Sequence, residues 1–187
     1  QGTAGVSGTA GVSGTAGVSG TAGATVMACA NSTVVSAGGN EANCGAKSNW
    51  VATAMPTPNS GLDGIADSQL LPKYAIDGNP TSRYSSGMTM AQGFYFQLDL
   101  GATKMVSGIV VDTSEDATDV ANGYEVDLST DGTTFTKIIG CAFPAAPTET
   151  INFTATSARY IRYINEGPPS NGGTSWLSIH EFDVTCN

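Results

Sequence analysis

Glycine occupies every third position from Gly2 to Gly23 without a miss, and this period constrains the start of the chain more than any other feature. The triplets read GTA GVS GTA GVS GTA GVS GTA GAT. A collagen-type triple helix requires this spacing, because only a hydrogen atom fits at its crowded axis. The segment contains no proline, so its backbone is not held in polyproline torsions in advance and loses more entropy on ordering.

We therefore expect residues 1–25 to be a collagen-like Gly-X-Y stalk or assembly segment that joins copies of the chain into a trimer or a fibre. Three alternatives stay open at this point. The composition is also that of a flexible linker. The six-residue unit GTAGVS could be a rung of a β-helix, and more than three glycine-rich extended helices could pack side by side.

Residues 26–187 follow a different pattern, in which short apolar stretches alternate with clusters of Gly, Asn, Asp and Pro. No window keeps a 3.6-residue period over three turns, whereas period-two alternation recurs, which predicts strands. The dipeptide Asp131-Gly132 is a strong hairpin signal. Because a single sheet could not bury the apolar faces of so many strands, we predict two packed sheets in an all-β sandwich or jelly roll. The expected strands are 50–54, 94–100, 106–112, 123–129, 135–139, 150–153, 159–164 and 177–184.

Charge limits the classes of partner. Charged residues are only 12% of the chain, and the net charge is −9 with just seven Lys and Arg. So few cations cannot neutralise a run of phosphates, which argues against nucleic acid and anionic membranes. No basic, apolar leader and no apolar run of about 18 residues occurs, so we expect a mature chain without a membrane span.

Four cysteines, Cys29, Cys44, Cys141 and Cys186, stand far apart without CxxC spacing, which favours two disulfides over a zinc or redox motif. Three pairings are possible. The outer pair brackets the compact region, so a Cys29–Cys186 bridge is the expected one, with Cys44–Cys141 following by elimination. Disulfides persist in oxidising compartments, so we expect a secreted, extracellular or cell-surface protein.

Five motifs in order resemble the discoidin family, also called the coagulation factor 5/8 type C domain, which includes the family 32 carbohydrate-binding modules. The resemblance spans roughly residues 45–185 and departs from the family at Tyr84, where tryptophan is usual. It implies a jelly-roll sandwich with ligand loops at one end and often a structural calcium. The motifs are AIDGNPTSRY (75–84), FQLDLG (96–101), YEV leading to STDG (124–132), ARYIR (158–162) and IHEFDV (179–184).

The turn around Asp77 is a candidate calcium site. Its side-chain oxygens could converge on a hard cation, and Glu181 could add a second carboxylate. An ordinary Asp-capped turn is the alternative. The strand near Glu181 also needs a bulge, since Ile179, Phe182 and Val184 cannot otherwise share one face. The ligands that the resemblance implies are the carbonyls of Tyr74 and His180 and the side chains of Asp77, Asn79, Ser82 and Glu181.

Sugar recognition needs an aromatic platform together with planar polar groups. The loop 167–176 offers Trp176 and Asn171, and the loops 85–92 and 114–122 offer Met88, Asp119 and Asn122. Galactose-binding relatives usually contact the sugar through a histidine and an arginine, and none of these loops carries either. Met88 and Met90 could instead be exposed spikes for a membrane, which the acidic charge opposes.

Catalysis is not expected, because the lone histidine, His180, lies in a strand beside Glu181 rather than in a nucleophile arrangement. We predict a non-catalytic module, displayed in several copies, whose partner is a glycan or an extracellular polysaccharide. The alternative is a structural subunit of an extracellular fibre, in which the sandwich at residues 26–187 is a cap or a packing surface.

Overall fold

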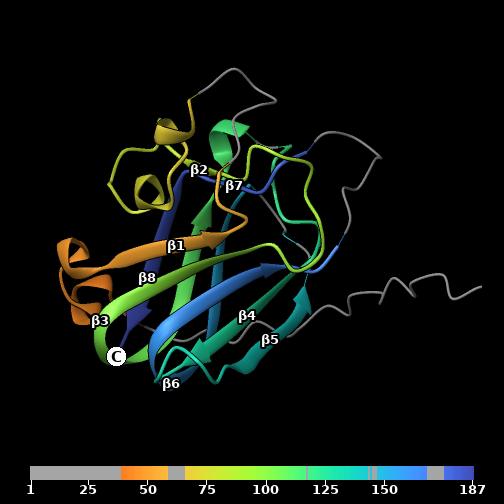
Figure 1. Ribbon diagram of the computed structural model, residues 1–187. Coiled ribbons are helices and arrows are strands. Elements are labelled where there is room, and N and C mark those ends of the chain that lie inside the picture. Colours follow the sequence, from red (N-terminus) through yellow and green to blue (C-terminus); the bar gives the residue numbers. More distant parts are fainter. Residues whose placement is uncertain (1–38, 59–65, 117, 143, 145–146, 168–174) are drawn as a thin grey trace, which may run out of the picture.

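The computed structural model describes residues 39–58, 66–116, 118–142, 144, 147–167 and 175–187, and these form a β-sandwich (Figure 1). The helical segments among them are short 3-10 turns. These are η1 (Glu41–Cys44), η2 (Lys47–Asn49), η4 (Asp67–Gln69), η5 (Pro72–Ala75) and η6 (Ser114–Asp116). The strands are β1 (Val51–Met55), β2 (Tyr84–Ser85), β3 (Tyr95–Asp112), β4 (Tyr124–Ser129), β5 (Thr136–Ala142), β6 (Thr148–Asn165), β7 (Ser178–Ile179) and β8 (Glu181–Cys186).

The two longest strands, β3 and β6, run antiparallel along their length and build both layers of the sandwich. Their pairing shifts register between Asp99 and Lys104, where Gly101 adopts a φ of 76°. A β-bulge bends a strand and increases its twist. Figure 1 shows both strands curving round at the lower edge, so that one pair of strands contributes to two facing sheets.

The first half of β3 joins β1, the second half of β6, β4 and β5 in one layer. The second half of β3 joins β8 and the first half of β6 in the other layer. Phe96 of the first layer and Phe182 of the second meet with ring centroids 5.0 Å apart, and both are fully buried. The core therefore lies between two antiparallel sheets, which confirms the predicted jelly-roll sandwich.

Four predicted strands were wrong in their extent. The segments 94–100 and 106–112 are parts of β3, and 150–153 and 159–164 are parts of β6. The glycine and small polar residues that interrupt each pattern mark a bulge within a strand, not the end of one. The hairpin expected at Asp131-Gly132 is present, since β4 and β5 pair antiparallel on either side of it.

The predicted strand 177–184 is broken at His180 into β7 and β8. β7 pairs with β2, whereas β8 pairs with β3, so the chain changes sheets at this residue. Ile179 and Phe182 are both fully buried. The irregularity expected near Glu181 is therefore present as a switch between two sheets.

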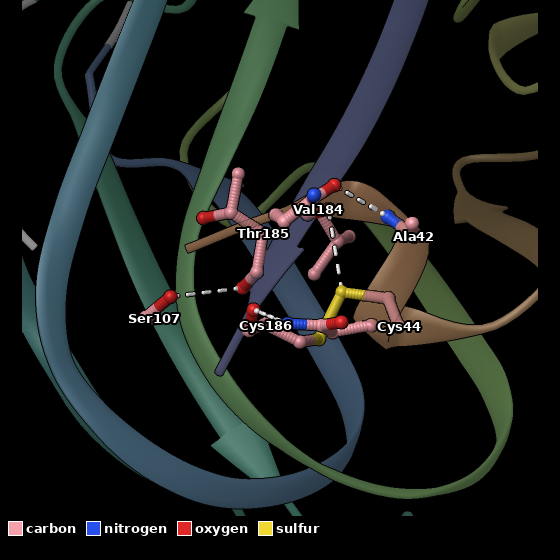
Figure 2. Close-up of a disulfide and its surroundings, with 8 residues drawn as sticks. Ala42, Cys44, Ser107, Val184, Thr185 and Cys186 are labelled. Atoms are coloured by element: carbon pink, nitrogen blue, oxygen red, sulfur yellow. Dashed lines mark hydrogen bonds between the residues drawn. A yellow bond between two sulfur atoms is a disulfide. The ribbon is translucent and has the colours of Figure 1, made fainter. Parts of the chain in front are cut away.

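Cys186 pairs with Cys44, so both expected bridges, Cys29–Cys186 and Cys44–Cys141, were wrong (Figure 2). Asn40 forms a β-bridge with Cys186, with Asn40 N donating to Cys186 O at 2.9 Å, which brings η1 against the end of β8. The disulfide therefore joins the end of η1 to the end of β8. Cys29 and the side chain of Cys141 lie outside the described residues.

Residues 1–38 also lie outside the described residues, and with them the glycine repeat and the expected boundary after residue 25. Among the described residues, no helix is long and apolar enough to cross a membrane.

Candidate functional site

Two adjoining cavities, of about 480 and 390 Å³, open at the end of the sandwich that carries η4, η6 and the break between β7 and β8. They share Arg83 and Asp116 in their linings, so we treat them as one feature, the loop-end groove. Figure 1 places this end at the top, opposite the C-terminus. The first cavity is lined by Gln69, Leu70, Tyr74, Thr81, Ser82, Arg83, Glu115, Asp116 and His180, and the second by Arg83, Asp116, Thr118, Asp119, Ser175 and Trp176.

Strand pairing brings together groove residues that are far apart in the sequence. Tyr84 of β2 lies opposite Ile179 of β7. Arg83 precedes this pair on one strand and His180 follows it on the other, so both enter the groove from the same edge. Tyr84 itself is fully buried beneath them.

Asp116, at the end of η6, lies between Arg83 and His180. Arg83 forms an ion pair with Asp116, and His180 Nε2 lies 3.5 Å from the same carboxylate. The ring of His180 is 2% exposed, and its Nδ1 has no hydrogen-bond partner in the described structure. Burial, followed by the charge of Arg83, lowers the pKa of His180 below its ordinary value, so the ring is neutral at neutral pH.

Asp119 holds the segment that carries Trp176. The Asp119 carboxylate accepts hydrogen bonds from Trp176 N at 3.2 Å and from Ser178 Oγ at 3.0 Å, and the residue is 8% exposed. Ser178 N also donates to Asp119 O at 3.1 Å. The backbone of Trp176, a partly exposed residue just before β7, is therefore held to the loop after η6.

The structure brings two of the five predicted ligand residues together. Trp176 and Asp119 line the same cavity. Asn122 is half-buried and its N–H donates to Asn165 Oδ1 at 2.8 Å, while Met88 is partly buried, and neither lines the groove. Asn171 lies outside the described residues.

The structure corrects two interpretations of this end of the molecule. Met90 is 2% exposed, so it is a core residue and not an exposed spike. An arginine and a histidine do line the groove, namely Arg83 and His180, although the loops considered for binding contain neither. The available signal was that Arg83, one of only seven Lys and Arg, ends the conspicuous turn that begins at Asp77.

The Asp77 turn is closed by its own side chains. Asp77 Oδ1 accepts from Asn79 N at 2.9 Å, and Asp77 Oδ2 accepts from Ser82 Oγ at 2.8 Å. Ser82 Oγ also lies 2.9 Å from Asn79 O. These contacts gather carboxylate, hydroxyl and carbonyl oxygens into one small region, as both the capped turn and the cation site would require.

Glu181, at the start of β8, carries an unpartnered buried oxygen near this turn. Glu181 Oε1 has no hydrogen-bond partner in the described structure, and Oε2 lies 3.5 Å from Lys47 Nζ. Burial raises the pKa of Glu181, and the charges of Asp183 and Asp77 raise it further, against the opposing effect of Lys47. A buried carboxylate oxygen without a donor, within the field of another carboxylate, has the environment that a bound cation would neutralise.

The residues therefore fit a calcium ion. Within the described part of the chain, no three Asp, Glu, His or Cys side chains cluster as a metal site. The predicted set has only two carboxylates, Asp77 and Glu181, and its other ligands are neutral oxygens. Oxygen ligands of this mixed kind suit Ca²⁺ better than a softer metal.

Together, the bent two-layer sheet and the groove at its loop end define a jelly-roll domain of the discoidin type. The F5/8 type C domain family matches residues 59–182, which is more than half of the chain. The protein belongs to this family.

Solved structures with the same fold include carbohydrate-binding modules. CpGH89CBM32-5 from Clostridium perfringens, in complex with GalNAc-β-1,3-galactose, is 23% identical with a TM-score of 0.58, covering 74% of this chain and 96% of its own. The family 32 module of C. perfringens NanJ, in complex with galactose, is 19% identical with a TM-score of 0.59 and coverages of 74% and 95%. Chitosan-binding module 2 from the chitosanase/glucanase of Paenibacillus sp. IK-5, in complex with chitotriose, is 23% identical with a TM-score of 0.56 and coverages of 73% and 95%. The search of curated protein sequences gave no match.

Proposed function

We propose that the protein is an extracellular, non-catalytic carbohydrate-binding module that holds a glycan in the loop-end groove. The observation that carries this is that Trp176 and the Arg83–Asp116 ion pair line one open cavity. An aromatic face packs against the apolar face of a sugar ring, while charged and amide groups bond its hydroxyls. Structural neighbours solved with bound galactose and chitotriose support the same class of ligand.

The groove is better arranged for binding than for hydrolysis. Glycoside hydrolysis needs two carboxyl groups that face each other across the scissile bond, one of them with a raised pKa. Asp116 is held by Arg83, and Asp119 is held by Trp176 N and Ser178 Oγ. Of the three acids in the lining, Asp116 and Asp119 therefore organise the groove, and Glu115 alone does not make the required pair.

The groove and the start of the described chain lie at opposite ends of the sandwich. Asn40 is bonded to Cys186 at the end of β8, whereas His180, just before β8, lines the groove. A stalk that continues from this end would leave the groove accessible in every copy. Several copies on one stalk would convert weak single-site affinity into avidity. The disulfide at this end supports an oxidising, extracellular location.

A calcium ion held by Asp77, Asn79, Ser82, Glu181 and two backbone carbonyls is part of the proposal. Its role is structural, because it would join the Asp77 turn to the start of β8, next to His180 in the groove. The supporting observation is the buried, unpartnered Glu181 Oε1.

A glycan array probed with the full chain in the presence of calcium tests the proposed function. We expect binding to a restricted set of glycans that is lost in Trp176→Ala. The same array probed with Glu166→Gln is the control, since Glu166 does not line the groove and bonds to Gln92 at 3.1 Å. Silence across the array for the folded wild type would overturn the proposal in favour of a structural subunit of a fibre.

Mass in solution tests the display of several copies. We expect the full chain to form a discrete oligomer that dissociates in a Gly11→Ala, Gly14→Ala variant, because alanine does not fit a close-packed glycine position. The matched control is Ser13→Ala with Thr15→Ala, which changes neighbouring positions of the repeat. Open polymers would favour the fibre, and a monomer would favour the linker.

A further inference from the structure

The charge balance of the loop-end groove is negative. One guanidinium, that of Arg83, faces three carboxylates, those of Glu115, Asp116 and Asp119. The described lining therefore carries two unbalanced negative charges.

The positive charge is also the less accessible one. The Arg83 side chain is 17% exposed and turned onto Asp116, whose side chain is 35% exposed. Glu115 is exposed on η6 beside them. A ligand that enters the groove therefore meets carboxylate oxygens before it meets the guanidinium.

The proposed calcium ion would not reverse this balance. Its two charges would be matched by Asp77 and Glu181, which are not in the groove lining. Lys47 is held by Asp183 and lies 3.5 Å from Glu181, so it compensates acids outside the groove. Lys73 Nζ lies 4.9 Å from the ring centroid of Tyr74 at the edge of the groove, but Lys73 is not part of the lining. The chain as a whole, at −9, adds to the negative potential.

From this geometry, we infer that the loop-end groove prefers cationic amino sugars, whose protonated amine is held by Glu115 and Asp116, over neutral sugars and over uronic acids. The inference rests on the proposed carbohydrate-binding function. A protonated amine would form charge-assisted hydrogen bonds to carboxylates that a neutral hydroxyl could not match. A uronate carries a carboxylate of its own, which the carboxylates of Glu115 and Asp116 would repel.

Isothermal titration calorimetry of the full chain with calcium, at a mildly acidic pH where the amines are protonated, tests this preference. The probes are glucosamine trimer, N-acetylglucosamine trimer, galactose and a uronic acid trimer. We expect glucosamine trimer to bind most tightly and the uronate not to bind. Raising the salt from about 0.01 M to about 0.1 M, which shortens the Debye length from about 30 to about 10 Å, should weaken only the glucosamine trimer.

The Glu115→Gln variant tests whether glucosamine trimer binds more tightly than N-acetylglucosamine trimer because of its charge or because it lacks the bulky acetyl groups. We expect it to weaken glucosamine trimer about two- to fivefold, the range for an exposed ion pair, and to leave N-acetylglucosamine trimer unchanged. Glu166→Gln, the same change in charge outside the groove, should alter neither. Trp176→Ala should weaken both trimers.

Each outcome decides between the two proposals. Equal or tighter binding of a neutral or uronic probe, or an unchanged glucosamine affinity in Glu115→Gln, overturns the charge preference and leaves the carbohydrate-binding function standing. Binding of no probe here and of no glycan on the array overturns both. Glucosamine binding that survives Trp176→Ala but falls in Glu115→Gln would show a simple ion pair at Glu115 without a sugar ring held against Trp176, and would also overturn the inference.

Discussion

The carboxylate of Asp119 accepts a hydrogen bond from the backbone N–H of Trp176 at 3.2 Å, so the aromatic wall of the groove depends on an acid in the loop after η6. Ser178 Oγ donates to the same carboxylate at 3.0 Å. Three segments, the loop after η6, the segment before β7, and β7 itself, are therefore held by one side chain. Binding and local stability should be coupled through it.

Replacing Asp119 should weaken binding indirectly. We expect Asp119→Ala to reduce glycan affinity about three- to tenfold and to cost about 1–3 kcal/mol of unfolding free energy, because the part-buried Trp176 N–H and the buried Ser178 hydroxyl lose this acceptor. Asp119→Asn keeps an acceptor for Trp176 N and should bind a neutral glycan more nearly as the wild type does. Calorimetry with the best glycan from the array, together with urea unfolding, measures both effects. An Asp119→Ala variant that is less stable but binds normally would show that the segment is held by other contacts.

Calcium should stabilise the folded chain. Since a ligand that binds only the folded state at a hundred times its Kd adds about 2.7 kcal/mol, the Tm should rise on adding calcium and fall back with a chelator. We expect Glu181→Gln to remove this shift, because the second carboxylate of the proposed site is lost. Glu166→Gln should keep it. Differential scanning calorimetry is the measurement, and an undiminished shift in Glu181→Gln would place the ion elsewhere.

Asp127 should make stability depend on pH. Burial on β4, and then the neighbouring charge of Glu125, raise the pKa of Asp127 from 3.8 to about 6. A raised folded-state pKa means that the protonated form is the stabilised one, so this contribution is fully present below 3.8 and is lost as the pH rises through about 6. We expect Asp127→Asn to be more stable than the wild type at neutral pH and to have a flatter stability curve between these values.

Urea unfolding across this pH range measures the effect. Glu166→Gln controls for the general loss of negative charge. The same slope in Asp127→Asn as in the wild type would show that other acids cause it. Lys137 and Arg162 also face Asp127, and their charges act against the shift.

The Cys44–Cys186 bridge should be both detectable and stabilising. Non-reducing peptide mapping should recover these two cysteines in one linked peptide. Because the bridge spans a sequence separation of 142 residues, removing it by Cys44→Ala with Cys186→Ala should cost about 2–5 kcal/mol of unfolding free energy. Recovery of Cys186 linked to Cys29 would contradict the structure and restore the pairing expected from the sequence.

Local pattern was enough to predict most of the strands. The strand expected at 123–129 is present as β4, and Tyr124, Val126 and Leu128, which alternate along it, are all buried. On the opposite face of β4, Glu125 and Ser129 are also buried, at 7% and 4% exposure. Alternation reports which side chains share a face, but what covers that face depends on neighbouring strands.

The residues of the candidate site were also predicted only in part. Trp176 and Asp119 were predicted because an aromatic residue and an acid stand in loops, which is visible locally. Arg83 was missed because its position depends on the pairing of Tyr84 with Ile179, across more than ninety residues of sequence.

What the sequence determined by itself was the period of three at the start of the chain, the strands and turns that follow, and the motifs that place the chain in its family. These are properties of neighbouring residues, and side-chain period and turn chemistry depend on local geometry. Only the tertiary structure decided that β3 and β6 bend into both layers, that Cys186 meets Cys44, and that Arg83, Asp116 and Trp176 share one groove. Those contacts form because closing the sandwich brings distant segments to one end, and no local period encodes which segments meet there.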